Sequence, residues 1–188
     1  DVPVENTRNI VVVGHAAAGK TTLVEALLHT AGMTTRLGSV EAKNTVSDSS
    51  LEEQERQLSI RAANLFLTYR DHNIFVSDTP GYADFYGEVV AAVSVADAAI
   101  VVVDALQGLE VGTQRIWELL AELKMPRLLV ISKLDKEHAE YQRTLDGIVA
   151  AFGGGCVPLT VPVGQQTQMR GMVHAMCSAA SDAEPTLY

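Results

Sequence analysis

Short apolar runs alternate along the chain with longer stretches in which apolar positions recur at helical spacing. Runs of β-branched and aliphatic residues predict buried strands at residues 9–13, 98–103 and 127–131. Helical spacing predicts helices in four stretches: residues 22–31, 84–96, 110–123 and 137–152. This alternation of strand and helix is typical of a mostly parallel sheet covered by helices.

An antiparallel hairpin is expected within this alternation. Residues 62–70 and 73–77 predict two strands that are joined by a turn at residues 71–73. Residues 157–163 could form a last strand. Residues 32–59 are polar and lack sustained periodicity, so we expect a long loop there, of the kind that is usually functional or mobile.

The composition is that of an ordinary globular domain. The 188 residues are 47% apolar and 20% charged, which is enough for one core and excludes disordered or collagen-like chains. The two cysteines are too few for a disulfide scaffold, and no apolar run is long enough to span a bilayer. No signal-peptide pattern is visible at the N-terminus. A cytoplasmic protein without membrane attachment is therefore predicted.

The charge balance limits the partners that are expected. Lys and Arg number 14 against 23 Asp and Glu, and the net charge of −9 argues against a surface that binds nucleic acid throughout. No DNA partner is predicted, and a monomer is expected. The chain begins with Asp1 in place of methionine, which we interpret as a piece of a longer protein.

A phosphate-binding motif lies between the first predicted strand and the first predicted helix. Residues 14–21 match G-x-x-x-x-G-K-[ST], in which glycines let backbone N–H groups turn toward phosphates. Lys20 would reach the β- and γ-phosphates, and the Thr21 hydroxyl would bind Mg²⁺. The candidate nucleotide-binding residues are Gly14, His15, Ala16, Ala17, Ala18, Gly19, Lys20, Thr21 and Thr22. With the element order, the motif predicts an α/β P-loop NTPase fold: a mostly parallel twisted sheet, helices on both faces and one antiparallel hairpin strand.

Two further motifs follow predicted strands and indicate guanine as the base. Ser132, Lys133 and Asp135 stand where GTP-binding proteins carry Asn/Thr-Lys-x-Asp. A buried Asp135 would accept two hydrogen bonds from guanine and discriminate strongly, because adenine lacks the paired donors. In the second motif, residues 78–81, Asp78 would hold Mg²⁺ through water and Gly81 could sense the γ-phosphate.

Motifs in this order resemble those of elongation factor G, a translational GTPase. The resemblance extends over roughly residues 9–173 and rests on residues 14–22, 53–60, 78–85, 102–109, 113–117 and 132–135. It implies a GTP-binding and GTP-hydrolysing domain of a multidomain factor, with GTP or GDP and Mg²⁺ as ligands and the ribosome as partner. In that family residues 53–60 belong to a switch segment, whose hydroxyl residue, here Ser59, would join Thr21 and Asp78 at Mg²⁺. We predict a GTP-binding core over residues 1–163, with residues 164–188 beginning an insertion or a truncated C-terminal part.

Several positions depart from the elongation factor G pattern. Tyr82 follows Gly81, where the family carries a histidine that positions the attacking water, and a phenol should stabilise developing charge less well than an imidazolium. Ala17 replaces an aspartate that the family associates with a monovalent cation. Ser59 and Ser132 replace a threonine and an asparagine. The departures resemble a second, divergent group of bacterial elongation factor G paralogues.

These departures leave several functions open. With Tyr82, Gly81 and Lys20 as the expected catalytic residues, we predict that hydrolysis is slow or altered, unless tyrosine is a competent substitute. One alternative is a GTP-binding module with impaired catalysis, and another is a ribosomal-protection or release-type factor. An ATP-dependent enzyme is disfavoured by Asp135. Residues 177–179, Cys-Ser-Ala, imitate a guanine-contacting Ser-Ala motif but lack a clear strand before them.

Overall fold

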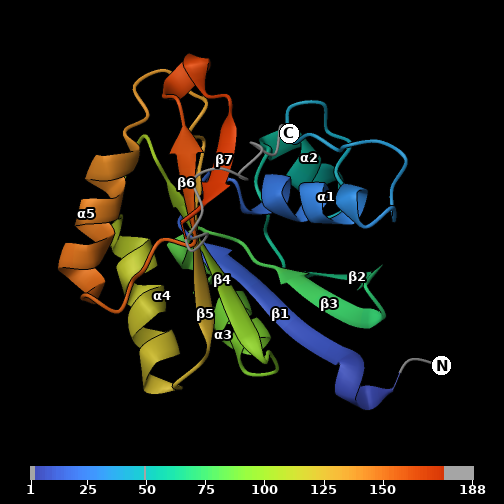
Figure 1. The fold of residues 1–188 in the computed structure, drawn as a ribbon. Coiled ribbons are helices and arrows are strands. Elements are labelled where there is room, and N and C mark those ends of the chain that lie inside the picture. The colour runs from blue at the N-terminus through green and yellow to red at the C-terminus, as the bar shows by residue number, and fades with distance from the viewer. Residues whose placement is uncertain (1–2, 49, 176–188) are drawn as a thin grey trace. The chain divides into compact units, whose positions relative to one another are not determined.

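A computed structural model describes residues 3–48 and 50–175 of the chain (Figure 1). The chain divides into two compact units, of which the first is residues 1–103 with 110–130 and the second is residues 104–109 with 131–188. Each unit has its own cluster of buried apolar side chains.

The main sheet has five strands and is mostly parallel. Strand β1 (Thr7–Gly14) lies between β3 (His72–Asp78) and β4 (Ala98–Asp104) and runs parallel to both. Strand β2 (Ala63–Tyr69) pairs antiparallel with β3, and β5 (Arg127–Ser132) completes the order β2-β3-β1-β4-β5. The parallel sheet and the antiparallel hairpin predicted from the sequence are confirmed.

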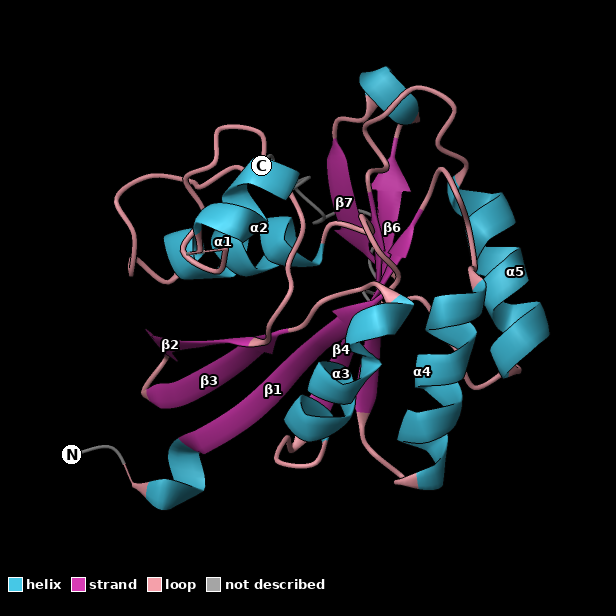
Figure 2. Cartoon of the chain, turned by 180° about the vertical axis from the view of Figure 1, so that it is seen from behind, coloured by secondary structure: helices cyan, strands magenta, loops and turns pink. Residues whose placement is uncertain are grey.

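Helices cover both faces of this sheet because the side chains of β1 point alternately to one face and the other. Val12 packs with α1 (Lys20–Thr30), whereas the valines on either side of it pack with α3 (Tyr86–Val93) and α4 (Val111–Glu122). Figure 2 shows α1 on one side of β1 and the helices α3 and α4 on the other. All three valines are fully buried, and burial of a valine stabilises the fold by roughly 1.5–3 kcal/mol. The predicted placement of helices on both faces is therefore confirmed.

The second unit contains α5 (Tyr141–Phe152) and a separate two-stranded sheet. Strand β6 (Thr160–Val163) is shorter than the predicted strand at residues 157–163, and it pairs antiparallel with β7 (Gly171–His174), which the sequence pattern did not reveal. Among the residues of this unit up to 175, the buried apolar cluster contains Ala105, Leu134 and Ala139, with Ile131, Tyr141, Met169 and Met172 packed against them.

Two predicted helices begin later than expected. The stretch predicted as a helix at residues 84–96 forms a 3₁₀ turn, Ala83–Phe85, before α3 begins. The helix predicted from residue 137 begins at Tyr141, because His138 adopts a left-handed φ of 68° that an α-helix does not allow. Apolar spacing alone did not reveal either interruption.

The predicted loop at residues 32–59 contains a short helix, α2 (Leu51–Arg56). Its first turn is closed by a capping box: the Ser50 hydroxyl accepts a hydrogen bond from the Glu53 amide, and the Glu53 carboxylate accepts one from the Ser50 amide. The sequence Ser-x-x-Glu is a local signal for such a box, so the pattern could have predicted this helix.

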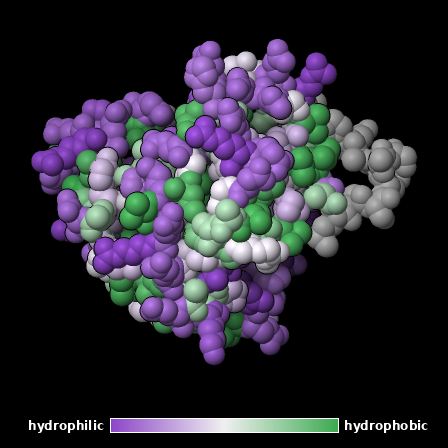
Figure 3. Space-filling view, turned by 90° about the vertical axis from the view of Figure 1, so that its left-hand side faces the viewer, coloured by the Kyte–Doolittle hydropathy of each residue, from purple (hydrophilic) through white to green (hydrophobic). Residues whose placement is uncertain are grey.

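Hydrophobic side chains are interspersed among hydrophilic ones on the face of the molecule that Figure 3 shows. Some large apolar side chains are strongly exposed, including Val4, Leu51 and Val111. Across residues 3–48 and 50–175, every helix is too short or too polar to cross a bilayer.

Candidate functional site

The phosphate-binding motif forms the turn between β1 and α1. Gly14 has a φ of 147°, and a side chain there would collide with the carbonyl oxygen of Val102 on β4. Gly19 has a φ of 92° and caps the N-terminus of α1. Ala17 adopts a left-handed φ of 57° on the exposed side of the turn. The strand–turn–helix arrangement that the motif requires is present.

Lys20 is buried inside this turn. Its Nζ donates a hydrogen bond of 2.8 Å to the carbonyl oxygen of His15, and the residue is 6% exposed. Burial lowers the pKa of the Lys20 ammonium to about 8, although the charges of Asp78 and Asp48 act in the opposite direction. A phosphate placed here would supply the buried ammonium with a close negative charge.

The three residues predicted to bind Mg²⁺ lie together. Thr21 Oγ1 donates a 2.8 Å hydrogen bond to Oδ2 of Asp78, and Ser59 Oγ lies 3.5 Å from the Thr21 hydroxyl. Burial raises the pKa of Asp78 to about 6, against the opposing effects of the Thr21 hydroxyl and the Lys20 charge. The other oxygen of Asp78, Oδ1, is buried and accepts no hydrogen bond of good geometry from the residues that the structure describes.

Asp48 joins the same cluster, although the sequence analysis did not select it. It is 5% exposed, and its Oδ1 accepts a 2.7 Å hydrogen bond from Ser59 Oγ. Burial is also the main cause that raises the pKa of Asp48, with smaller effects from Ser59 and two charged neighbours. Two buried carboxylates and two hydroxyls are hard oxygen donors, and such donors fit Mg²⁺.

The pKa of Asp78 predicts how the stability of the chain depends on pH. Because burial raises this pKa from 3.8 to about 6, the folded state binds more protons than the unfolded state between these values. The free energy of unfolding should therefore fall as the pH rises from about 4 to about 6. Urea unfolding across this range is the measurement, with Asp78→Asn as a non-titrating variant. A pH dependence as steep in Asp78→Asn as in the wild type contradicts the prediction. Asp48, whose pKa is also raised by burial, contributes a slope of the same sign in both proteins.

Two buried glutamates hold the long loop around this cluster. Glu25 of α1 accepts a 2.6 Å hydrogen bond from the Val46 amide, and Gly38 packs so closely on this carboxylate that a side chain at residue 38 would collide with it. Glu53 accepts hydrogen bonds from the amides of Ile60 (3.0 Å) and Arg61 (3.3 Å). Burial acts to raise the pKa of Glu53, but these bonds and those from Ser50 hold it below its usual value. Glu53 thereby fixes the backbone next to Ser59.

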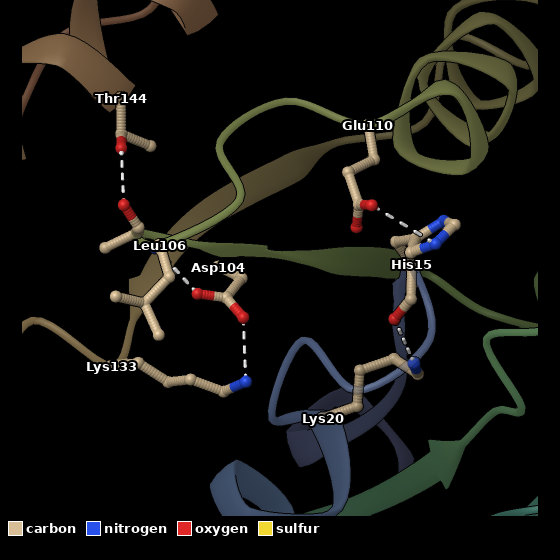
Figure 4. Close-up of polar contacts among 8 residues, drawn as sticks. His15, Lys20, Asp104, Leu106, Glu110, Lys133 and Thr144 are labelled. Atoms are coloured by element: carbon tan, nitrogen blue, oxygen red, sulfur yellow. Dashed lines mark hydrogen bonds and ion pairs between the residues drawn. The ribbon is translucent and has the colours of Figure 1, made fainter. Parts of the chain in front are cut away.

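The predicted catalytic residues Gly81 and Tyr82 differ in how closely they are packed. Gly81 is packed against Lys20 Nζ and the backbone of Ala16, and a Cβ at residue 81 would lie only 2.6 Å from the Ala16 nitrogen. Tyr82 caps a 3₁₀ turn and is 47% exposed. His15 reaches in another direction, with Nε2 3.4 Å from the carboxylate of Glu110 at the start of α4 (Figure 4). The structure thus brings Gly81 against the phosphate-binding turn, whereas Tyr82 is about half exposed.

The residues predicted to recognise the base belong to the second unit. The carbonyl oxygen of Ser132 accepts a 3.1 Å hydrogen bond from the Ala105 amide. Lys133 Nζ lies 2.7 Å from Oδ2 of Asp104, a residue that was not selected from the sequence (Figure 4). The Asp135 side chain is 65% exposed and pairs with Lys136 at 3.5 Å. The buried Asp135 that was considered from the sequence is therefore not observed. Residues 177–179, the Cys-Ser-Ala segment, lie outside the described residues.

Comparisons of this chain with family models, curated proteins and solved structures agree with one another. The family model for the elongation factor Tu GTP binding domain matches residues 5–184. A mitochondrial ribosome-releasing factor 2 from Culex quinquefasciatus is 35% identical over 93% of this chain and 23% of its own length. Its counterpart from Candida albicans is 36% identical over 76% of this chain and 18% of its own length. A crystal structure of a Thermus thermophilus protein superposes with a TM-score of 0.83 at 38% identity, over 89% of this chain and 25% of the other.

The match to the family model covers nearly the whole sequence and agrees with the fold and the phosphate-binding turn. The chain spans about a fifth to a quarter of the length of these two curated relatives. The resemblance inferred from the motifs is confirmed: this chain belongs to the family of elongation factor Tu GTP-binding domains.

Proposed function

We propose that the chain binds GTP with Mg²⁺ and hydrolyses it to GDP and phosphate, as the switch domain of a longer ribosome-associated translation factor. The observation that carries the proposal is the cluster of Thr21, Asp78 and Ser59 in the same unit as the buried ammonium of Lys20. The names and lengths of the ribosome-releasing factor 2 relatives support the ribosome as partner and further domains as part of the protein.

In this proposal the phosphates are held by Lys20 and by backbone N–H groups of the phosphate-binding turn. Phosphoryl transfer depends mainly on positioning and charge stabilisation, for which the protein needs few covalent steps. A pKa of about 8 leaves most Lys20 side chains protonated at neutral pH, so the ammonium can offset charge on the phosphate oxygens. Thr21, Ser59 and Asp78 would hold Mg²⁺, and the ion would neutralise further charge on the β- and γ-phosphates.

Gly81 would connect the phosphates to the switch. Its backbone is packed against Lys20 and Ala16, so a phosphate that binds Lys20 must contact or displace the Gly81 peptide. The absence of a side chain permits this close approach. Asp135 would accept hydrogen bonds from guanine, for which its exposed carboxylate is accessible, while Ser132 and Lys133 shape the same segment.

Tyr82 sets the expected rate of hydrolysis. A phenol can hydrogen-bond the attacking water but cannot become cationic, so ribosome-stimulated turnover should be slow, and Tyr82→His should raise it by about tenfold or more. Phosphate release by the full-length protein with ribosomes measures this. Tyr69→His, at another exposed tyrosine, is the matched control.

The same assay separates the second candidate function. The exposed ring of Tyr82 favours a GTP-binding module without meaningful catalysis, which would release no phosphate with ribosomes while still binding GTP. A high wild-type rate that Tyr82→His leaves unchanged would overturn the role given to Tyr82.

The remaining parts of the proposal concern the surroundings of the protein. We propose a monomer without a DNA partner, which the net charge of −9 supports. The cytoplasm is the proposed compartment, and the mitochondrial relatives make the mitochondrion its alternative. Fractionation of cells that express the tagged full-length protein distinguishes the two compartments.

A further inference from the structure

Asp104, the last residue of β4, uses both carboxylate oxygens within the second unit (Figure 4). Its Oδ1 accepts a 2.8 Å hydrogen bond from the Leu106 amide, and its Oδ2 lies 2.7 Å from Lys133 Nζ. The residue is 3% exposed. A buried carboxylate needs such partners, because an unpaired buried charge strongly destabilises a protein.

Lys133 is held in an unusual conformation by its surroundings. Its φ of 58° lies in the left-handed region, which a lysine adopts only when neighbouring contacts determine it. Two links join its segment to the segment after β4: the Ala105 amide donates to the Ser132 carbonyl oxygen, and Leu134 packs in one apolar cluster with Ala105. The Lys133 side chain remains 30% exposed, so part of it is accessible to a ligand.

We propose that Asp104 is a positioning residue for the base, which fixes the ammonium of Lys133 so that its aliphatic stem forms one wall of the guanine subsite. The inference rests on the proposed binding of guanine nucleotides. Lysine is a flexible side chain, and holding it before the ligand arrives removes an ordering cost from binding. Asp104 then raises affinity without touching the nucleotide.

The informative variant is Asp104→Asn, which has nearly the same shape. Its amide oxygen can still accept from the Leu106 amide, but its NH₂ group cannot pair with the Lys133 ammonium. GDP affinity, measured by titration calorimetry on this chain, should fall about tenfold, with most of the change in the dissociation rate. Asp146→Asn, at an exposed aspartate of α5 in the same unit, is the control and should leave GDP affinity unchanged.

A double-mutant cycle with Lys133→Met shows whether Asp104 acts through Lys133. In the Lys133→Met background the ammonium is absent, so Asp104→Asn should cause no further loss of GDP affinity. A role in general stability would instead weaken binding about equally in both backgrounds, and that outcome overturns the proposal. An Asp104→Asn variant that binds GDP as tightly as the wild type overturns it as well.

The cycle also separates this inference from the proposed function. If the unmodified chain binds no GDP, the proposed function fails and the positioning role fails with it. If the unmodified chain binds GDP but the cycle shows no coupling between residues 104 and 133, only the positioning role is refuted. Thermal unfolding of each variant verifies that the fold is retained.

Discussion

Replacing Lys20 with alanine should abolish detectable binding of GDP and GTP. The ammonium is buried within the phosphate-binding turn and donates to the carbonyl of His15, so it already lies where a phosphate must bind. Removing one partner of a buried charge pair costs about 2–5 kcal/mol, which corresponds to a loss in affinity of roughly 30- to 5,000-fold. Equilibrium titration with a fluorescently labelled GDP analogue measures the loss.

Two further variants assign this loss to the charge. Lys20→Met keeps most of the volume of the side chain, so it avoids the cavity that alanine leaves and should bind nucleotide as poorly. Lys124→Ala removes an exposed lysine of the same unit and should bind GDP like the wild type. GDP affinity retained in Lys20→Met would refute the role of the ammonium, and with it the assignment of the phosphate site.

Asp135→Asn should change the base preference of the protein from guanine to xanthine. A carboxylate accepts from both the ring N–H and the exocyclic amine of guanine, whereas an asparagine amide offers one acceptor and one donor. Xanthine carries a carbonyl oxygen where guanine carries the amine, so it matches the amide. GDP affinity should fall by about 100-fold or more, because the asparagine NH₂ group would face the exocyclic amine of guanine, donor against donor, and leave both without an acceptor in the complex.

Competition of GDP, xanthosine diphosphate and ADP against a labelled nucleotide tests this exchange. The wild type should select GDP, and Asp135→Asn should select xanthosine diphosphate, while ADP competes with neither. Asp146→Asn makes the same chemical change on an exposed face of α5 and should keep the preference for GDP. A guanine preference that survives in Asp135→Asn means that residue 135 does not read the base.

Local patterns were sufficient for most of the fold. The β-branched run that ends at Gly14 and the apolar spacing after Lys20 predicted β1 and α1, because strand and helix periods are properties of neighbouring residues. The interruption before Tyr141 depends on the left-handed backbone of His138, which residue spacing does not encode. Strand β7 escaped prediction because its four residues are too few for a reliable alternation.

The candidate site was predictable only in part. Thr21 and Asp78 were selected because each belongs to a motif with a recognisable spacing, whereas Ser59 was selected from the resemblance to elongation factor G. Asp48 belongs to no motif: its hydrogen bond to Ser59 spans 11 residues of an aperiodic loop. The ion pair between Asp104 and Lys133, 29 residues apart, likewise appears only once the strands are aligned.

The sequence by itself determined which chemistry this protein carries: a phosphate-binding turn, a base-recognition segment and the α/β order that places both after strands. Only the tertiary structure decided how the charged groups are paired. Thr21 and Asp78 are 57 residues apart, and they meet because β1 and β3 are adjacent parallel strands whose carboxyl ends share one edge of the sheet. Burial at that edge lowers the pKa of Lys20 and raises that of Asp78, since desolvation depends on packing that residue spacing does not contain.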